Sequence, residues 1–327
     1  MSAVTRRRSP WTHFVVQNVP LLLALFLLLA SLIVYVVLFY GNEHRIPGNF
    51  EATSISNNAL PLAIAATGQT IVILTGGIDL SVGGMMDITN SVTAVHMHDS
   101  PGSMVLWSLV VILIGAAGGL LNGLLVAIGR LQPILVTLAT LSIFQGIAIK
   151  ILPTPGGQVP PSFTNLLTNP NRPTALIYVA LIILLWLIFR RTSFGISIFA
   201  IGNDRQAARA NGVNVLWARV GAFILAGIMS ALAGMFLAAT TTGGDATTGD
   251  AFTLTSIAAV VLGGVSLFGG RGSAIGSVAG AFVLTLLINI LFFANINPLY
   301  QSFYEGVFLI GAVVLTVLIG RYLRRAT

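Results

Sequence analysis

Side chains able to do chemistry are few in this sequence, and their spacing matches no catalytic pattern. There is no cysteine, which excludes disulfides, thiolate metal sites and cysteine nucleophiles. The one lysine, Lys150, does not follow the glycines of a P-loop, so the chain has no such site for ATP. His96 and His98 stand beside Asp99, but residues two positions apart do not share a helix face. We therefore predict no metal, no cofactor and no enzyme activity.

Asp87 is a carboxylate inside an apolar stretch. Such a group is costly in lipid and is expected to face protein or water. Arg130 or Arg271 is the expected ion-pair partner, with a protonated carboxyl as the alternative. More polar residues continue along the same stretch and the one before it, which suggests a hydrated pathway. The residues we expect to line that pathway are Gln69, Asp87, Asn90 and Thr93.

Other polar residues have simpler expected roles. Asp79 stands just before the same apolar stretch, where it is expected to cap a helix by accepting from the amide of Ser81 or Val82. Polar residues within the other apolar stretches are expected to hydrogen-bond neighbouring helices, as is usual in membrane bundles. These are Gln69, Asn122, Gln145, Asn289 and Glu305.

The composition shows which elements must position these residues. Only 8% of the 327 residues are charged, against about 25% in soluble domains, and the mean hydropathy is +0.94. Apolar runs of about 20 residues, long enough to cross a bilayer as helices, recur along the chain. We predict an all-α, polytopic membrane protein with ten spans. These are 19–40, 58–75, 81–98, 104–130, 133–152, 174–189, 218–242, 252–268, 274–294 and 304–320.

The distribution of basic residues predicts the orientation. With the N-terminus in the cytoplasm, thirteen arginines fall inside and three basic residues outside, as the positive-inside rule requires. The outside set is Arg45, Lys150 and Arg172. This bias explains the pI of about 10.6 without a nucleic-acid partner. The predicted orientation divides the chain into a cytoplasmic N-terminal tail (1–18), one transmembrane domain (19–320) and a cytoplasmic C-terminal tail (321–327).

Small residues recur every fourth position in several spans. Residues four apart share a helix face, and small ones let helix backbones approach closely in lipid. We expect these faces to be packing contacts rather than ligand contacts. The sets are Gly115, Gly119 and Gly123; Gly272, Gly276 and Gly280; and Ala226, Ser230 and Gly234.

Two glycine-rich segments, 75–84 and 263–272, resemble each other. Interruptions at corresponding positions of two halves are typical of broken helices that line a transport path. We therefore expect these segments to be equivalent breaks in two halves of the molecule.

A basic, polar stretch between two spans covers 190–217. Its middle, Asp204 to Ala210, is predicted to form a short helix, with Asn203 or Asp204 as its cap and Gly212 at its end. The residues alone leave two roles open. The helix would dock onto another protein, or it would lie on lipid headgroups with its arginines facing anionic lipid.

Three blocks in chain order resemble one known family. They are ILTGGIDLSVGG (73–84), FAIGNDRQAARANGVNV (199–215) and IAAVVLGGVSLFGGRGSAIGSVAGA (257–281). They are similar to the hallmark blocks of ABC sugar-importer permeases of the ribose/xylose/arabinose type. The matching motif residues are Gly76, Gly77, Asp79, Ser81, Gly83, Gly263, Gly264, Gly269, Gly270, Arg271 and Gly272.

The resemblance implies a subunit of a bacterial inner-membrane importer, with a fold similar to that of the vitamin B12 importer permease. It implies a second permease subunit, identical or not, a cytoplasmic ABC ATPase and a periplasmic sugar-binding protein. It favours the docking role for the 190–217 loop. The docking residues it implies are Asn203, Asp204, Arg205, Ala208, Arg209, Gly212 and Asn214.

Other functions stay open at this point. Permeases for inositol, a furanose signalling compound or amino acids have related sequences. A secondary transporter working without ATP would need an intramembrane charge pair. A membrane-bound enzyme would need a convergent acid–base or metal cluster, which the few histidines and carboxylates do not supply.

Overall fold

The computed structural model of the protein describes residues 10–300, 303–304, 306–308, 310–311 and 314, and this part of the chain is helical without strands. The C-terminal tail (321–327), residues 1–9 of the N-terminal tail, Glu305 and most of the predicted span 304–320 lie outside it. The helices are α1 (Pro10–Glu43), α2 (Asn49–Leu74), α3 (Val82–His96), α4 (Pro101–Ala127), α5 (Pro133–Ile151), α6 (Pro161–Leu167), α7 (Thr174–Phe189), α8 (Ser193–Asn203), α9 (Arg205–Ala210), α10 (Val215–Thr241), α11 (Asp250–Leu262), α12 (Ala274–Phe293) and the 3₁₀ turn η1 (Pro298–Tyr300).

The predicted membrane fold is confirmed, but the number of ten spans is not. Six described helices are long and apolar enough to cross a bilayer, and α7 with α8 makes a seventh, bent by 77°. The six are α1 from Val19, α2, α4, α5, α10 and α12. The predicted spans 81–98 and 252–268 are instead the short helices α3 and α11, of 15 and 13 residues. At about 1.5 Å per residue, each covers only part of a ~30 Å hydrocarbon layer.

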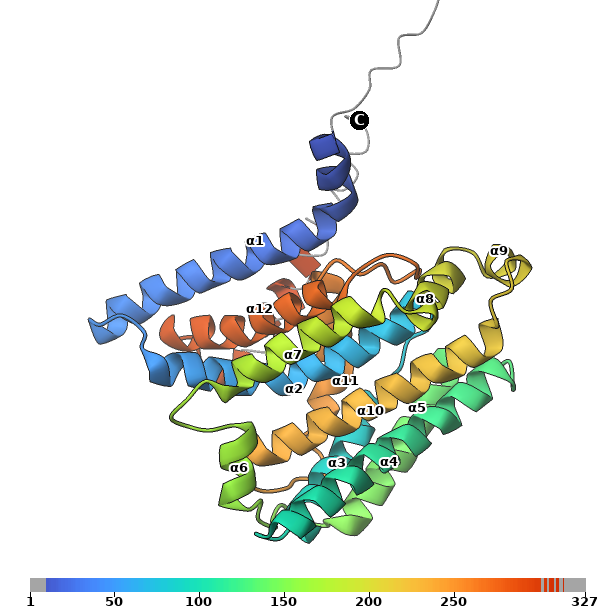
Figure 1. The fold of residues 1–327 in the computed structure, drawn as a ribbon. Helices are drawn as coiled ribbons and strands as arrows, with labels where there is room; N and C mark the ends of the chain where they lie inside the picture. The colour runs from blue at the N-terminus through green and yellow to red at the C-terminus, as the bar shows by residue number, and fades with distance from the viewer. Residues whose placement is uncertain (1–9, 301–302, 305, 309, 312–313, 315–327) are drawn as a thin grey trace, which may run out of the picture.

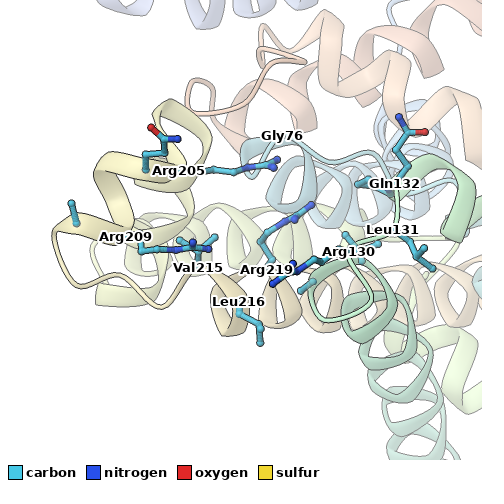
Figure 2. A pocket seen from close by; sticks show the side chains of 14 residues that line it. Gly76, Arg130, Leu131, Gln132, Arg205, Arg209, Val215, Leu216 and Arg219 are labelled. Atoms are coloured by element: carbon cyan, nitrogen blue, oxygen red, sulfur yellow. The ribbon is translucent and has the colours of Figure 1, made fainter.

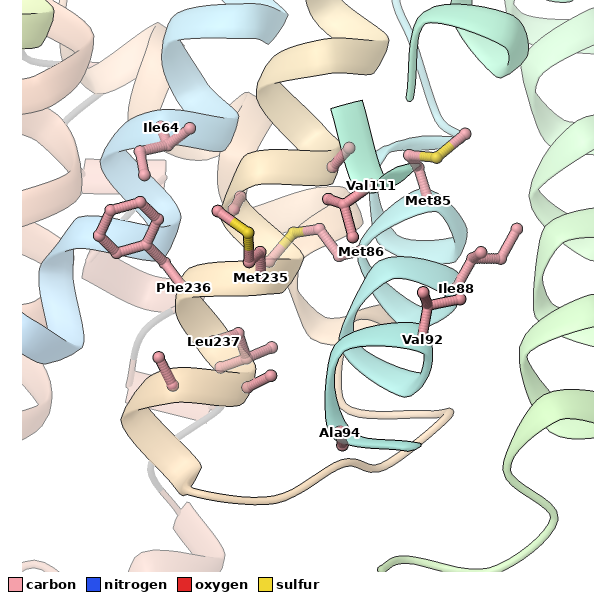
Figure 3. Close-up of a cluster of buried hydrophobic side chains, with 14 of the residues drawn as sticks. Ile64, Met85, Met86, Ile88, Val92, Ala94, Val111, Met235, Phe236 and Leu237 are labelled. Atoms are coloured by element: carbon pink, nitrogen blue, oxygen red, sulfur yellow. The ribbon is translucent and has the colours of Figure 1, made fainter. Parts of the chain in front are cut away.

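Helix α10 lies in the middle of the bundle and packs against α2, α3 and α4 (Figure 1). Its contact with α3 forms the main apolar cluster, in which Met235 of α10 lies near Met86 of α3 and Phe236 of α10 lies near Ile64 (Figure 3). Ile64 of α2 packs in the same cluster. Because α10, α5, α4 and α11 all pack against α3, every residue of α3 from Val82 to Ala94 is buried.

The faces of small residues are helix contacts, as predicted, except at Gly272, which lies in the loop before α12 with φ +138°. A Cβ at Gly119 of α4 would lie 2.8 Å from the Cα of Ile224 in α10. In α12, Gly276 and Gly280 lie against the backbone of Gly263 and Ala259. Close approach of backbones therefore joins α4 to α10 and α12 to α11.

Each short helix follows a non-helical segment that enters the bundle. Residues 75–81 precede α3, and residues 242–249 precede α11. The second segment runs along α3, where the amide of Asp245 donates to Oδ1 of Asn90 (2.8 Å) and that of Gly249 donates to Oδ1 of Asp87 (2.6 Å). Polar side chains of α3 thus satisfy backbone groups that no helix satisfies at this depth.

The order long helix, non-helical segment, short helix, long helix occurs twice, from α2 to α4 and from α10 to α12. The counterpart of 75–81 is therefore 242–249. The predicted equivalence of 75–84 with 263–272 is wrong, because 263–272 follows its short helix instead of preceding it. Gly76 of the first segment and Gly264, Gly269 and Gly270 of the second have positive φ in turns, which accounts in part for the similar composition.

Candidate functional site

The end of the bundle that carries α8 and α9 holds most of the motif residues (Figure 1). Oδ1 of Asp204 accepts from the amides of Gln206 and Ala207, at 2.8 and 3.0 Å, and so caps α9. Gly212 has φ +84°, and the next amide returns to the carbonyl of Ala208 at 3.0 Å. The predicted short helix, its cap and its glycine stop are confirmed.

Helix α9 is anchored to the bundle by one buried side chain. Ala208 packs against Ile201 of α8 and against Val215 and Ala218 of α10. Asn214 then caps α10, since its Oδ1 accepts from the amide three residues on at 3.2 Å. With short, capped connections on both sides, α9 is positioned to transmit a displacement to α8 and α10.

The motif glycines meet behind α9 in what we term the glycine junction, formed by Gly76, Gly202, Gly269 and Gly270. The amide of Gly270 donates to the carbonyl of Leu74 at 3.0 Å, and Nδ2 of Asn203 donates to the carbonyl of Gly270 at 3.3 Å. A Cβ at Gly202 would meet both backbones.

Three segments far apart in sequence therefore converge on α8, which links the first and last motif blocks directly to the 190–217 loop. The remaining motif residues lie at contacts nearby. Gly77 lies near Val72, Gly83 against Gly249, Gly264 against Pro20 of α1, and Gly272 against Val265, while the carbonyl of Arg271 accepts from Ser266.

Asp79 is held in a buried hydrogen-bond network. Its Oδ1 accepts from the amide of Ser81 at 2.8 Å, as predicted, and from the Ser81 hydroxyl at 2.6 Å. Asn122 of α4 donates to that hydroxyl, and Thr140 of α5 donates to Asn122, both at 2.8 Å. The network ties the segment before α3 to two long helices, which makes Asp79 a positioning residue.

The residues expected to line a pathway are all inside the protein. Gln69, Asp87, Asn90 and Thr93 are at most 1% exposed, and none of them lines either of the two clefts described below. The expected arginine partner of Asp87 is wrong. The amide of Gly249 takes that place, while Arg130 lies in a cleft at the α9 end.

His96 and His98 form no metal site with Asp99 in the described structure. The His96 ring stacks on Trp107, with ring centroids 4.6 Å apart. Stacking of this kind accounts for a histidine at a helix end without a ligand.

Gln145 hydrogen-bonds a neighbouring helix, as predicted, but sequence reasoning missed its partner and the place of this polar pair at the surface. Nε2 of Gln145 in α5 donates to Oδ1 of Asp250, the first residue of α11, and Asp250 is exposed. Gln145 lies roughly 18 Å along α5 from its first residue, which is well inside a membrane-spanning helix. The sequence analysis did not single out Asp250, because this residue lies just before the predicted span 252–268.

Sequence reasoning also missed a cleft of about 780 Å³ between α9, the α4–α5 turn and the start of α10. Four arginine side chains line it, from three different elements (Figure 2). They are Arg130, Arg205, Arg209 and Arg219. A second cleft of about 400 Å³ lies between α2, α11 and α12, with Asn58, Thr255, Thr285 and Asn289 among its lining residues.

The family model described as the branched-chain amino acid transport system / permease component matches residues 52–317, most of the chain. The protein belongs to this permease family. No solved structure matches it.

Curated relatives align over most of this permease. It is 35% identical to the ribose import permease protein RbsC of Bacillus subtilis (strain 168), over 82% of this chain and 86% of the relative. It is 35% identical to the galactofuranose transporter permease protein YtfT of Escherichia coli (strain K12), over 96% and 91%. It is 32% identical to the autoinducer 2 import system permease protein LsrC of Yersinia enterocolitica, over 80% and 74%. The permease family and the six helices long enough to cross a bilayer together show that this is a multi-pass membrane protein.

Proposed function

We propose that this permease is the membrane-spanning subunit of an ATP-driven importer that moves a monosaccharide across the bacterial inner membrane by alternating access. The relatives' names support a sugar, since they concern ribose and galactofuranose. Autoinducer 2 in a third name keeps other small polar solutes as the alternative, with inositol and amino acids among them. Specificity is set upstream by a periplasmic binding protein, which delivers the solute.

The observation that carries the proposal is the α9 element. It is capped by Asp204, anchored by Ala208 and joined to the glycine junction through α8. In this proposal the end with α9 and both termini are cytoplasmic, and the exposed face of α9 docks onto a separate ABC ATPase. Two permease subunits, identical or not, pair with two ATPases, and closure of the ATPases tilts α8 and α10.

The hydrogen-bonded pair of Gln145 and Asp250 indicates where the transport path lies in this proposal. An exposed carboxylate well inside a spanning helix bundle is costly in lipid and belongs at water or at a partner surface. We therefore place the path along the α5–α11 face, with Asp250 and Gln145 offering an acceptor and an amide to sugar hydroxyls. Asp87 and Asn90 lie behind them and hold the 242–249 segment in place.

A secondary transporter is the second candidate, and the described structure gives it little support. The one ion pair in the described part joins Arg45 to Glu51 at the end opposite α9, with Nη2 and Oε1 2.6 Å apart. A charge pair in the bundle interior, of the kind that coupling to an ion gradient uses, is not among the described contacts.

Docking is tested with Gly212→Val. No atom lies within 4 Å of a Cβ there, so the substitution acts through the positive φ and disrupts the end of α9 without a clash. We expect loss of ATP-driven uptake and of ATPase co-purification from native membranes. Gly102→Val is the matched control, since Gly102 has equal space and no positive φ. Unchanged uptake and co-purification in Gly212→Val would refute the docking assignment.

The path is tested with single cysteines, which the cysteine-free chain allows without background. Gln145→Cys should react with a charged, membrane-impermeant maleimide, whereas Ile143→Cys on the opposite side of α5 should not. Equal labelling of the two positions would contradict the proposed path.

A further inference from the structure

The cleft at the α9 end has a charge composition that the transport path does not use. Arg205 and Arg209 are one helical turn apart in α9 and both line the cleft. Arg130 enters from the α4–α5 turn and Arg219 from the first turns of α10. Figure 2 shows these side chains directed into the same space.

No carboxylate lines this cleft in the described structure, so four positive charges share it without a counter-ion. The partners that are present are weak. Nη2 of Arg205 lies 3.4 Å from the carbonyl oxygen of Thr75, and Nε of Arg219 is buried without a hydrogen bond among the described residues. Like charges in a partly desolvated cleft repel one another, and an anion placed between them removes that repulsion.

The backbone around the cleft is shaped to hold this arrangement. Arg130 has φ +55°, which is unfavourable for a residue with a side chain and persists only where the surroundings require it. Gly76 has φ +78°, and a Cβ there would lie 3.4 Å from Nη2 of Arg205. The turn at Arg130 directs its side chain toward the other guanidinium groups.

Apolar residues complete the lining, including Val126, Leu131 and Leu216. Just outside it, Ile128 and Trp217 are 53% and 58% exposed. An exposed tryptophan beside arginines at the ends of spanning helices is typical of the headgroup level of a membrane. A ligand for this cleft therefore has both an anionic group and an apolar part.

We propose that this cleft binds the phosphate-bearing headgroup of an anionic phospholipid from the cytoplasmic leaflet, with the acyl chains along Leu131 and Ile128. Guanidinium groups bind phosphate oxygens in bidentate fashion, and the cytoplasmic leaflet carries anionic lipid. This rests on the proposed orientation but not on ATPase docking. The bound lipid would neutralise the face of α9 that looks toward the membrane and leave its outer face for a protein partner.

The test is native mass spectrometry of the full chain, purified in detergent and supplied with phosphatidylglycerol or phosphatidylcholine. We expect phosphatidylglycerol to be retained selectively. The double variant Arg130→Gln/Arg219→Gln should weaken its retention about thirtyfold, at roughly 1 kcal/mol for each arginine. The matched control is Arg190→Gln/Arg191→Gln, which removes two exposed charges at the same end outside the cleft and should change retention little.

Competition with inorganic phosphate and ATP separates the possible sources of the anion. If either displaces phosphatidylglycerol at equal concentration, the cleft takes a free phosphate and the lipid assignment is overturned. Equal retention of both lipids, or equal loss in the control variant, overturns it too. Because no ATPase is present, failure of this assay leaves the docking proposal to its own test.

Discussion

The contact between α4 and α10 leads to a quantitative prediction for Gly119→Ala. The added Cβ would lie 2.8 Å from the Cα of Ile224 and 2.9 Å from the carbonyl carbon of Phe223. Both are backbone atoms and cannot rotate away, so we take the upper end of the overpacking range, about 3 kcal/mol. Alanine regains about 1 kcal/mol of helix propensity over glycine. The net destabilisation is therefore about 2 kcal/mol.

The assay is the fraction of detergent-solubilised protein that stays monodisperse after heating. At roughly 2 °C per kcal/mol for a large domain, Gly119→Ala should lower the midpoint by about 4 °C. Gly146→Ala is the matched control, because nothing lies within 4 Å of a Cβ at Gly146 of α5. It should leave the midpoint unchanged or raise it. A Gly119→Ala midpoint equal to that of Gly146→Ala would show that α4 and α10 do not approach as described.

Two further predictions concern the buried network and the path. Asn122→Leu removes the hydrogen-bond partner of the Ser81 and Thr140 hydroxyls. A buried polar group left unpaired costs about 1–3 kcal/mol, so this variant should have a lower heating midpoint in the same assay. An unchanged midpoint would mean that the network is not formed. Asp250→Asn replaces a charged hydrogen-bond acceptor, whose bond to the solute contributes about 1.5 kcal/mol, with a neutral one. Uptake into vesicles should slow about tenfold, while ATPase co-purification is kept. Full uptake by this variant would show that Asp250 does not line the path.

Features that depend on local sequence could be predicted. Asp204 and Gly212 stand at the two ends of α9, and each acts on backbone groups within a few residues. The packing role of Gly119 followed from its spacing alone. Local hydrogen bonding and helix periodicity act over a few residues, so one sequence is enough to reveal them.

Features that depend on distant segments could not be predicted. The neutral partner of Asp87 is a backbone amide 162 residues away in the chain, so charge matching wrongly suggested an arginine. Hydropathy alone assigned full spans to α3 and α11. It does not distinguish a membrane-spanning helix from a short apolar one such as α3, which protein covers, or α11, which packs against α12, α2 and α3.

The short helix α3 has a consequence for how the protein is made. At about 22 Å it is too short to cross the bilayer unaided, and a carboxylate such as Asp87 opposes insertion by the translocon. Its cover includes α10, which leaves the ribosome well after α3 does. Membrane integration of α3 is therefore completed only when α10 arrives. A chain that ends before residue 215 lacks both α10 and Gly249, so its Asp87 has neither the helix that packs on α3 nor the amide that donates to its carboxylate.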